Sequence, residues 1–368
     1  MAEIAIVHDY LTQRGGAERV VLALADAFPG ADIVTSLFDP HATYPEFASL
    51  RVRTLPINRL RHLRRDHRLA LPVLAPAFSG ANVDCSVAVC SSSGWAHGVK
   101  VTGRKIVYCH NPARWLYQTD SYLEGMGAGT RIALSTLRPA LTRWDRKAAL
   151  SADLYVVNSN VVRDRVRSAY GIDALVVHPP FSLGTDGPIS PIAGVDTGFF
   201  LCVSRLLSYK NVESIVEAFR MLPHLRLLVI GGGPLFRALQ LGAPSNVTIC
   251  GEVDDATLRW SYSKCAGVVA ASYEDFGLTP VEGAAFGKPT VALRWGGFLD
   301  TVVEERTGVF FDNPEPASIA LAVSHLCSQK WDESEIRQWA RRFSPQYFTA
   351  TMRGLVTQEL AAIGEDRQ

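Results

Sequence analysis

The segment SYEDFGLTPVEGAAFGKP (272–289) stands between two short apolar runs, GVVAA (267–271) and TVAL (290–293). Runs of this length and composition are typical of buried strands. Pro280 suits the first turn of a helix, because its missing N–H has no hydrogen-bond partner to lose there. Gly287 suits the end of that helix. The segment therefore predicts a strand, a loop, a short helix and a second strand.

Two glutamates of this segment, Glu274 and Glu282, allow two interpretations. In the first, Thr279 is the N-cap residue and Glu282 completes a capping box by returning to the N–H of the cap. Glu274 is then an ordinary loop acid. In the second, the free N–H groups of the loop and first turn hold an anion, and the carboxylates bind hydroxyl groups. A nucleotide sugar carries both kinds of group.

Strand candidates alternate with helical periodicity along the chain, which predicts parallel sheets covered on both faces by helices. The candidates are 3–8, 32–38, 85–90, 105–110, 154–159 and 174–179, followed by 199–204, 225–232, 246–251, 267–272 and 289–293. A segment rich in Gly, Pro and Ser, 181–198, separates the two series and is typical of a linker.

We therefore predict an α/β protein with two doubly wound, Rossmann-like domains, residues 1–185 and 186–344, that face each other across a cleft. Ligands of such sheets bind at the carboxyl ends of the strands. The final segment, 345–368, has helical spacing of its apolar residues. It could end the second domain or cross back to the first.

The two halves of the chain differ in charge. Residues 1–185 hold 21 Lys and Arg against 15 Asp and Glu, whereas residues 186–368 hold 16 against 21. Much of the basic excess lies between Arg51 and Arg68, where seven arginines alternate with leucines. This stretch could rest on an anionic membrane or hold an anionic acceptor, or it could be a solvated basic helix packed on the core. No nucleic-acid-binding motif accompanies it, so we expect no nucleic-acid partner.

Seven cysteines are present and none forms a CxxC pair, which predicts reduced thiols and a cytoplasmic protein without a zinc or redox site. The first residues enter a strand directly, so no signal peptide is expected. No apolar run approaches the roughly 20 residues of a membrane helix. Contact with the inner membrane face would then be peripheral.

Further polar or glycine-rich groups follow strand candidates. Gly15 and Gly16 precede a helix and could let a phosphate approach the backbone, although a tight turn explains them equally well. Arg205 and Lys210 could bind a diphosphate or form surface ion pairs, and Asn211 could cap the next helix. His110 ends a strand, where it could face a cleft or be a satisfied core histidine.

Together these motifs resemble the family 4 glycosyltransferases, a retaining family with the GT-B fold. The resemblance spans nearly the whole chain. The motifs appear in the order of the family: GGAERV (15–20), SRLLSYKN (204–211), GGGP (231–234), ASYEDFGLTPVEGAAFGKPTVA (271–292) and a Gly-Gly with an acid three residues on (296–300). Glu274 and Glu282 match its E-x7-E pattern. Asp300 stands where glutamate is usual, which leaves the fine positioning of the donor open.

The resemblance implies a role for each matching residue. Glu282 would hold the ribose hydroxyls of the donor, and Glu274 would face the transferred hexose. Arg205 and Lys210 would bind the leaving diphosphate, and His110 would lie by the reacting sugar. The remaining donor-binding residues would be Gly15, Gly16, Phe276, Gly277, Leu278 and Thr279.

The resemblance also implies the reaction. We expect a metal-independent enzyme without a cofactor that moves a hexose with retention, most similar to bacterial mannosyltransferases of surface-polysaccharide assembly. GDP-mannose is the favoured co-substrate and UDP-sugars are the main alternative. The acceptor would be a glycan, a lipid-linked sugar or a small molecule. A nucleotide-sugar epimerase and a sugar-nucleotide sensor are the other readings.

Overall fold

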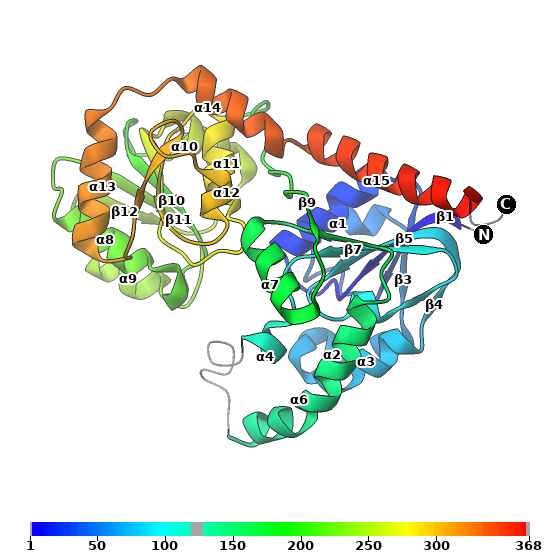
Figure 1. Ribbon diagram of the computed structural model, residues 1–368. Coiled ribbons are helices and arrows are strands. Elements are labelled where there is room, and N and C mark those ends of the chain that lie inside the picture. The colour runs from blue at the N-terminus through cyan, green and yellow to red at the C-terminus, as the bar shows by residue number, and fades with distance from the viewer. Residues whose placement is uncertain (1, 119–127, 366–368) are drawn as a thin grey trace. The chain divides into compact units, whose positions relative to one another are not determined.

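The computed structural model describes residues 2–118 and 128–365. The chain divides into two compact units (Figure 1). The first comprises Met1–Pro179 and Pro345–Gln368, and the second comprises Pro180–Ser344. The second unit thus begins six residues before the expected boundary at 186. The segment expected to be a linker packs on this unit, because Leu183 is buried in its core.

The first unit is built on a seven-stranded parallel sheet in the order β3-β2-β1-β5-β7-β8-β9. Its strands are β1 (Ala2–His8), β2 (Asp32–Thr35), β3 (Val52–Thr54), β5 (Cys85–Ser92), β7 (Arg104–Cys109), β8 (Leu154–Val157) and β9 (Leu175–Val176). A separate pair consists of β4 (Asn82–Val83) and β6 (Lys100–Val101). The chain order reverses beside β1, since β2 and β5 lie on either side of it.

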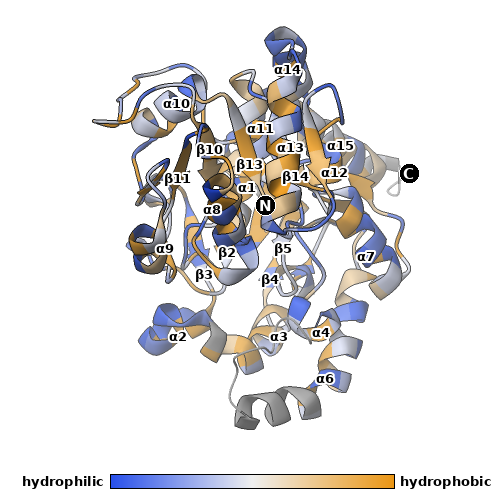
Figure 2. Ribbon diagram, turned by 90° about the vertical axis from the view of Figure 1, so that its left-hand side faces the viewer, coloured by the Kyte–Doolittle hydropathy of each residue, from blue (hydrophilic) through white to orange (hydrophobic). Residues whose placement is uncertain are grey.

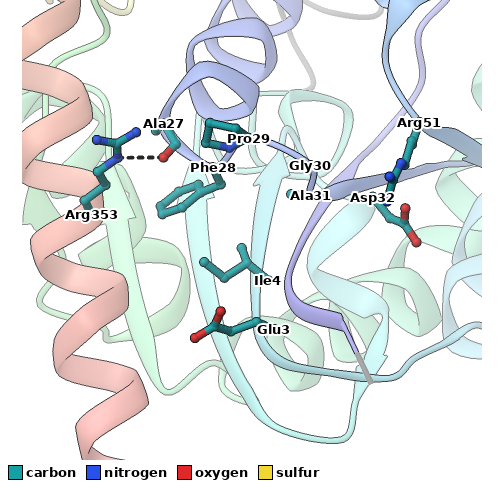
Figure 3. A pocket seen from close by; sticks show the side chains of 10 residues that line it. All are labelled: Glu3, Ile4, Ala27, Phe28, Pro29, Gly30, Ala31, Asp32, Arg51 and Arg353. Carbon is teal, nitrogen blue, oxygen red and sulfur yellow. Dashed lines mark hydrogen bonds between the residues drawn. The ribbon is translucent and has the colours of Figure 1, made fainter.

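Helices cover this sheet, and one of them comes from the far end of the chain. They are α1 (Gly16–Ala27), α2 (Arg61–Arg65), α3 (Leu71–Ser79), α4 (Arg114–Tyr117), α6 (Ala128–Ala149), α7 (Asn160–Tyr170) and α15 (Pro345–Glu365). Helix α15 packs beside α1, and Arg353 Nε donates a 2.7 Å hydrogen bond to the carbonyl of Ala27 (Figure 3). The terminal helix therefore belongs to the first unit, which periodicity could not decide.

The second unit contains a six-stranded parallel sheet in the order β12-β11-β10-β13-β14-β15. Its strands are β10 (Phe200–Val203), β11 (Leu227–Ile230), β12 (Val247–Cys250), β13 (Gly267–Ala270), β14 (Thr290–Leu293) and β15 (Gly308–Phe311). The order reverses between β10 and β13. In doubly wound sheets, ligands bind outside the carboxyl ends of the strands at such a reversal.

The helices of the second unit are α8 (Val212–Arg220), α9 (Phe236–Gly242), α10 (Asp255–Lys264), α11 (Leu278–Ala285), α12 (Phe298–Thr301), α13 (Pro316–Ser328) and α14 (Glu333–Ala340). Every residue of β13 and β14 is buried, and both strands are coloured hydrophobic in Figure 2. Burial on both faces explains why these strands appear in the sequence as continuous apolar runs.

Each predicted strand is present and is usually shorter than its apolar run. Four strands were not predicted: the sheet-edge strands β3 and β15, and the short separate pair β4 and β6. In β3, two of the three residues are exposed, so its sequence lacks an apolar run. Strand β15 follows β14 closely and forms the other edge of its sheet. Exposure thus explains why β3 was missed, whereas β15 is almost entirely buried and was missed for another reason.

Candidate functional site

The loops after β10 and β13 meet at the reversal point of the second sheet. Lys210 follows β10 and Glu274 follows β13, and the Lys210 ammonium pairs with Glu274 Oε1. Ser272 Oγ donates a 3.1 Å hydrogen bond to the same carboxylate oxygen. The structure therefore brings together two predicted site residues that are 64 positions apart.

Asn211, which follows Lys210, has a left-handed backbone conformation and links two loops of the site. Asn211 has φ of +54°, and its side-chain amide donates a 2.8 Å hydrogen bond to the carbonyl of Ala271. The prediction that Asn211 caps α8 is wrong, because its side chain makes no capping bond. The amide instead ties the loop after β10 to the loop after β13. Lys210 is only 8% exposed, so its position is set by the surrounding backbone.

Arg205 is placed differently from Lys210. Its side chain is exposed, and one guanidinium nitrogen donates a 3.2 Å hydrogen bond to Tyr209 Oη. The Lys210 ammonium lies 4.9 Å from the centre of the same tyrosine ring. The two cations thus flank Tyr209, one fixed by an ion pair and one at the surface.

The capping box at the start of α11 is absent. Gly277 is the N-cap residue, with φ of +88°, and no side chain caps the helix. Thr279 Oγ1 instead donates a 3.2 Å hydrogen bond to the carbonyl of Val203 at the end of β10. Leu278 begins the helix, and Phe276 is buried against Phe343. The start of α11 therefore has no side-chain hydrogen bond that caps it.

Glu282 has a tyrosine as a hydrogen-bond partner. The fully buried Tyr262, on α10, donates a 2.8 Å hydrogen bond to Glu282 Oε2. Burial, with the neighbouring Glu282 charge, raises the pKa of Tyr262 well above its ordinary value, so the phenol keeps its proton. Glu282 is itself 9% exposed. A carboxylate oriented by a donor on one oxygen can still accept hydrogen bonds on the other.

Replacing Glu282 with glutamine is expected to weaken nucleotide-sugar binding about 10- to 100-fold, because hydrogen bonds to a charged group contribute about 1.5–3 kcal/mol. The glutamine carbonyl can still accept the hydrogen bond from Tyr262, so the melting temperature should stay close to that of the wild-type protein. Titration calorimetry and thermal unfolding of the two proteins measure both quantities. An unchanged dissociation constant would leave Glu282 with a structural role only.

A second glycine pair supports the Glu274 loop, and sequence reasoning gave it no structural role. Gly297 N–H donates a 3.0 Å hydrogen bond to the carbonyl of Glu274. A Cβ on Gly297 would lie 2.2 Å from Phe276 Cα, and one on Gly296 would lie 2.3 Å from the Glu274 carbonyl oxygen. Two backbone segments are in contact here, which only glycine permits. In the sequence, the Gly-Gly motif was the one feature that could have indicated this close backbone contact. Asp300 follows in α12.

The reversal point of the first sheet carries its own polar cluster. His8 ends β1, and its Nδ1 lies 3.0 Å from both the carbonyl oxygen and Oγ of Ser91 on β5. Ser91 Oγ lies 2.7 Å from Nε2 of His110, which follows β7. His110 therefore lies at a strand end, as predicted, and it is partly exposed. His8 and Ser91 were not predicted, because each stands at the end of an apolar run next to another polar residue, Asp9 or Ser92, and belongs to no motif.

Gly15 and Gly16 begin α1 beside this cluster. Gly15 is the N-cap residue, and a Cβ there would lie 2.6 Å from Glu18 Oε2, whereas open space surrounds the Cβ position of Gly16. Glu18 is 1% exposed. Burial raises its pKa, opposed by the nearby His8.

A buried network next to this cluster contains the residue types of a hydrolase triad. Ser92 Oγ lies 3.0 Å from His97 Nδ1, and His97 Nε2 lies 3.1 Å from Asp145 Oδ1. All three side chains are at most 1% exposed, so no substrate can reach the serine. Asp145 also accepts a 2.9 Å hydrogen bond from Tyr117. The network holds α6 and α4 to the sheet.

Within the described residues, no group of three or more His, Cys, Asp or Glu side chains could hold a metal ion. In the same part of the chain, no helix is both long and apolar enough to cross a membrane.

Two family models match the chain, one on each unit. The model described as Glycosyltransferase Family 4 matches residues 14–182, and the model described as Glycosyl transferases group 1 matches residues 192–343. A GDP-mannose-dependent alpha-(1-6)-phosphatidylinositol monomannoside mannosyltransferase of Mycolicibacterium smegmatis is 29% identical over 49% of this chain and 54% of its own length. A D-inositol 3-phosphate glycosyltransferase of Mycobacterium tuberculosis is 28% identical over 62% of this chain and 52% of its own. The chain thus matches about half the length of these relatives.

Solved structures share the architecture. Sucrose-phosphate synthase of Thermosynechococcus elongatus aligns with a TM-score of 0.68 at 21% identity, over 98% of this chain and all of that one. HepE of Anabaena, in complex with UDP-glucose, aligns with a TM-score of 0.67 at 16% identity, over 98% and 99%. At these identities the similarity establishes the fold.

Proposed function

Because this chain belongs to the family 4 glycosyltransferases of GT-B fold, we propose that it transfers a hexose from a nucleotide sugar to an acceptor hydroxyl with retention of configuration. GDP-mannose is the favoured donor. A glycan, a lipid-linked sugar or a small molecule is the acceptor class.

The ion pair between Lys210 and Glu274 at the reversal point of the second sheet is the observation that carries this proposal. A donor has a diphosphate that needs cations and a sugar that needs hydrogen-bond acceptors. Lys210 and Arg205 supply the first, and Glu274 supplies the second. The first turn of α11, with no capping side chain, adds N–H groups for an oxyanion.

In the proposed reaction, the bond between hexose C1 and the diphosphate oxygen breaks, and both of its electrons leave with the phosphate. A bond forms between C1 and the acceptor oxygen on the same face. The acceptor hydroxyl gives its proton to the leaving phosphate. Negative charge grows on the diphosphate, and Lys210 and Arg205 stabilise it in the transition state. The cations suffice for this charge, so no metal ion is required.

The donor can be identified by thermal unfolding with GDP, UDP, GDP-mannose and UDP-glucose. At 100 times its dissociation constant, a ligand stabilises the protein by about 2.7 kcal/mol, so GDP and GDP-mannose are expected to raise the melting temperature and the uridine compounds are not. Stabilisation by the UDP pair alone would change the donor and keep the reaction.

Product analysis with GDP-mannose and candidate acceptors then tests transfer itself. Activity should persist in excess EDTA. Conversion of the nucleotide sugar without an acceptor would identify an epimerase instead. Loss of activity in EDTA that magnesium or manganese restores would contradict the metal-independent site.

We further propose that the basic stretch from Arg51 to Arg68 rests on an anionic membrane surface and presents the enzyme to a lipid-linked acceptor. The stretch forms β3, short turns and α2 rather than one helix. Of the arginines from Arg51 to Arg65, all but Arg64 are exposed. Leu60 and Leu69 are also exposed, at 47% and 59%. Figure 2 shows α2 as largely hydrophilic. Exposed cations beside exposed leucines suit both the headgroups and the acyl boundary of a bilayer.

Liposome co-sedimentation tests this contact. Each basic residue near an anionic surface contributes about 1 kcal/mol, so the wild-type protein is expected to sediment with anionic liposomes at low salt and to be released as salt rises. Changing Arg61, Arg64 and Arg65 to Ser should abolish sedimentation and preserve donor binding.

A matched control replaces three exposed arginines elsewhere, Arg167, Arg237 and Arg341, by Ser. This variant has the same net charge as the first and should still sediment. Wild-type protein that stays in the supernatant at low salt would end the membrane proposal and leave the transferase proposal intact.

A further inference from the structure

The buried side chain of Ser91 links two histidines at the reversal point of the first sheet, where β1, β5 and β7 are neighbours (Figure 1). Ser91 is fully buried, and His8 is 2% exposed. Ser91 Oγ lies 3.0 Å from His8 Nδ1 and 2.7 Å from His110 Nε2. Because a buried hydroxyl without a partner is unfavourable, the single proton of Ser91 should be used in one of these contacts.

The direction of each hydrogen bond follows from the carbonyl oxygen of Ser91. His8 Nδ1 lies 3.0 Å from that carbonyl, and a carbonyl can only accept, so His8 Nδ1 must carry a proton. The same N–H lies 3.0 Å from Ser91 Oγ, which therefore accepts from His8. Among the described residues, His110 Nε2 is the remaining partner of this hydroxyl. Ser91 Oγ–H then donates to His110 Nε2, which must be unprotonated.

A neutral imidazole with an unprotonated Nε2 carries its proton on Nδ1. Burial, with His8 next to it, lowers the pKa of His110 to about 3, so the neutral form prevails near neutral pH. Within the described residues, His110 Nδ1 makes no hydrogen bond, and His110 keeps a partly exposed surface. Its free polar group is thus an N–H donor.

We propose that Ser91 and His8 are positioning residues that hold His110 in the Nδ1–H tautomer, so that His110 serves the transferred hexose as a hydrogen-bond donor and not as a proton acceptor. The role toward the hexose rests on the proposed function. The tautomer itself rests only on the contacts among the three residues. An N–H donor would bind a sugar hydroxyl oxygen, and the acceptor's proton would go to the leaving phosphate.

The tautomer can be measured on the whole protein by long-range proton–nitrogen correlation after labelling the histidine rings with ¹⁵N. The chain has nine histidines, and a His110→Gln variant assigns the signal. The expected spectrum shows a protonated Nδ1 and an unprotonated Nε2 for His110 at neutral pH. A protonated Nε2 would overturn the proposal.

The Ser91→Ala variant tests the positioning role. Without the hydroxyl, the signal of His110 should change to a mixture of tautomers, and turnover should fall about 3- to 10-fold, as for the loss of one neutral hydrogen bond. The dissociation constant for GDP should stay within about twofold. Ser91→Thr keeps the hydroxyl and should restore the wild-type tautomer.

Each combination of results has a separate meaning. An unchanged His110 tautomer in Ser91→Ala overturns the positioning role. If the wild-type protein shows the expected tautomer but consumes no nucleotide sugar, the proposed function fails and the tautomer assignment holds. A changed tautomer with unchanged turnover overturns the role of His110 toward the hexose.

Discussion

Replacing Lys210 with alanine is expected to lower turnover about 10²- to 10³-fold, the usual loss when one preorganised donor to developing charge is removed. The same change should also destabilise the protein. Lys210 is buried and its ammonium pairs with Glu274, and a hydrogen bond to a charged group contributes about 1.5–3 kcal/mol. A surface ion pair, which the sequence allows for this residue, would predict little effect on stability.

The Arg205→Ala variant should be compared with Lys210→Ala. Arg205 is exposed and contacts Tyr209, so its removal should reduce turnover with the melting temperature nearly unchanged. Lys330→Ala, an exposed lysine in the same unit, controls for net charge and should behave as wild type. Steady-state kinetics and thermal unfolding separate the three. Rates within about threefold of wild type for both Lys210→Ala and Arg205→Ala would remove the diphosphate role.

Gly297→Ala is expected to destabilise the protein by about 3 kcal/mol or more, at the upper end of overpacking effects. The backbone of Gly297 has φ of −69°, which any residue can adopt, so the effect is steric. Its Cβ would lie 2.2 Å from Phe276 Cα and 2.3 Å from the Phe276 carbonyl oxygen. Backbone atoms cannot rotate away, so the loop that carries Glu274 must move.

Movement of that loop should also reduce turnover, since a displacement of 1 Å at a reacting group can cost about 10²-fold. Gly354→Ala is the matched control. Gly354 lies within α15, with nothing within 4 Å of its Cβ position, and alanine there should stabilise the helix by about 0.5–1 kcal/mol. Denaturant unfolding of both variants checks the pair. Equal stability of Gly297→Ala and wild type would contradict the close approach of these two segments.

Local backbone could be predicted from the sequence because it depends on neighbouring residues. The apolar runs at 267–271 and 290–293 are strands, Pro280 is in the first turn of a helix and Gly287 follows its end. The same periodicity indicated two series of strands, and the motif order indicated the family that the family models identify. The edge strand β3 was missed because exposure removes the apolar pattern.

Side-chain partners were predicted poorly wherever a local partner competed with a distant one. Thr279 and Asn211 each have a capping position available, yet they bond to Val203 and Ala271, which lie 76 and 60 positions away. Glu282 accepts from Tyr262, 20 positions before it. Local capping rules count only groups within a few residues. They give no information about which strand ends lie next to each other.

The sequence by itself determined that the chain has two main series of parallel strands, the approximate places of these strands, and which charged and glycine residues follow them, because these properties depend on local composition and spacing. The tertiary structure alone decided the strand order, and with it the pairing of Lys210 with Glu274 and of Ser91 with His8 and His110. Strand order follows from which apolar faces pack together across the whole unit. For that reason, the chemistry of each residue could be read from the chain, whereas its partner could not.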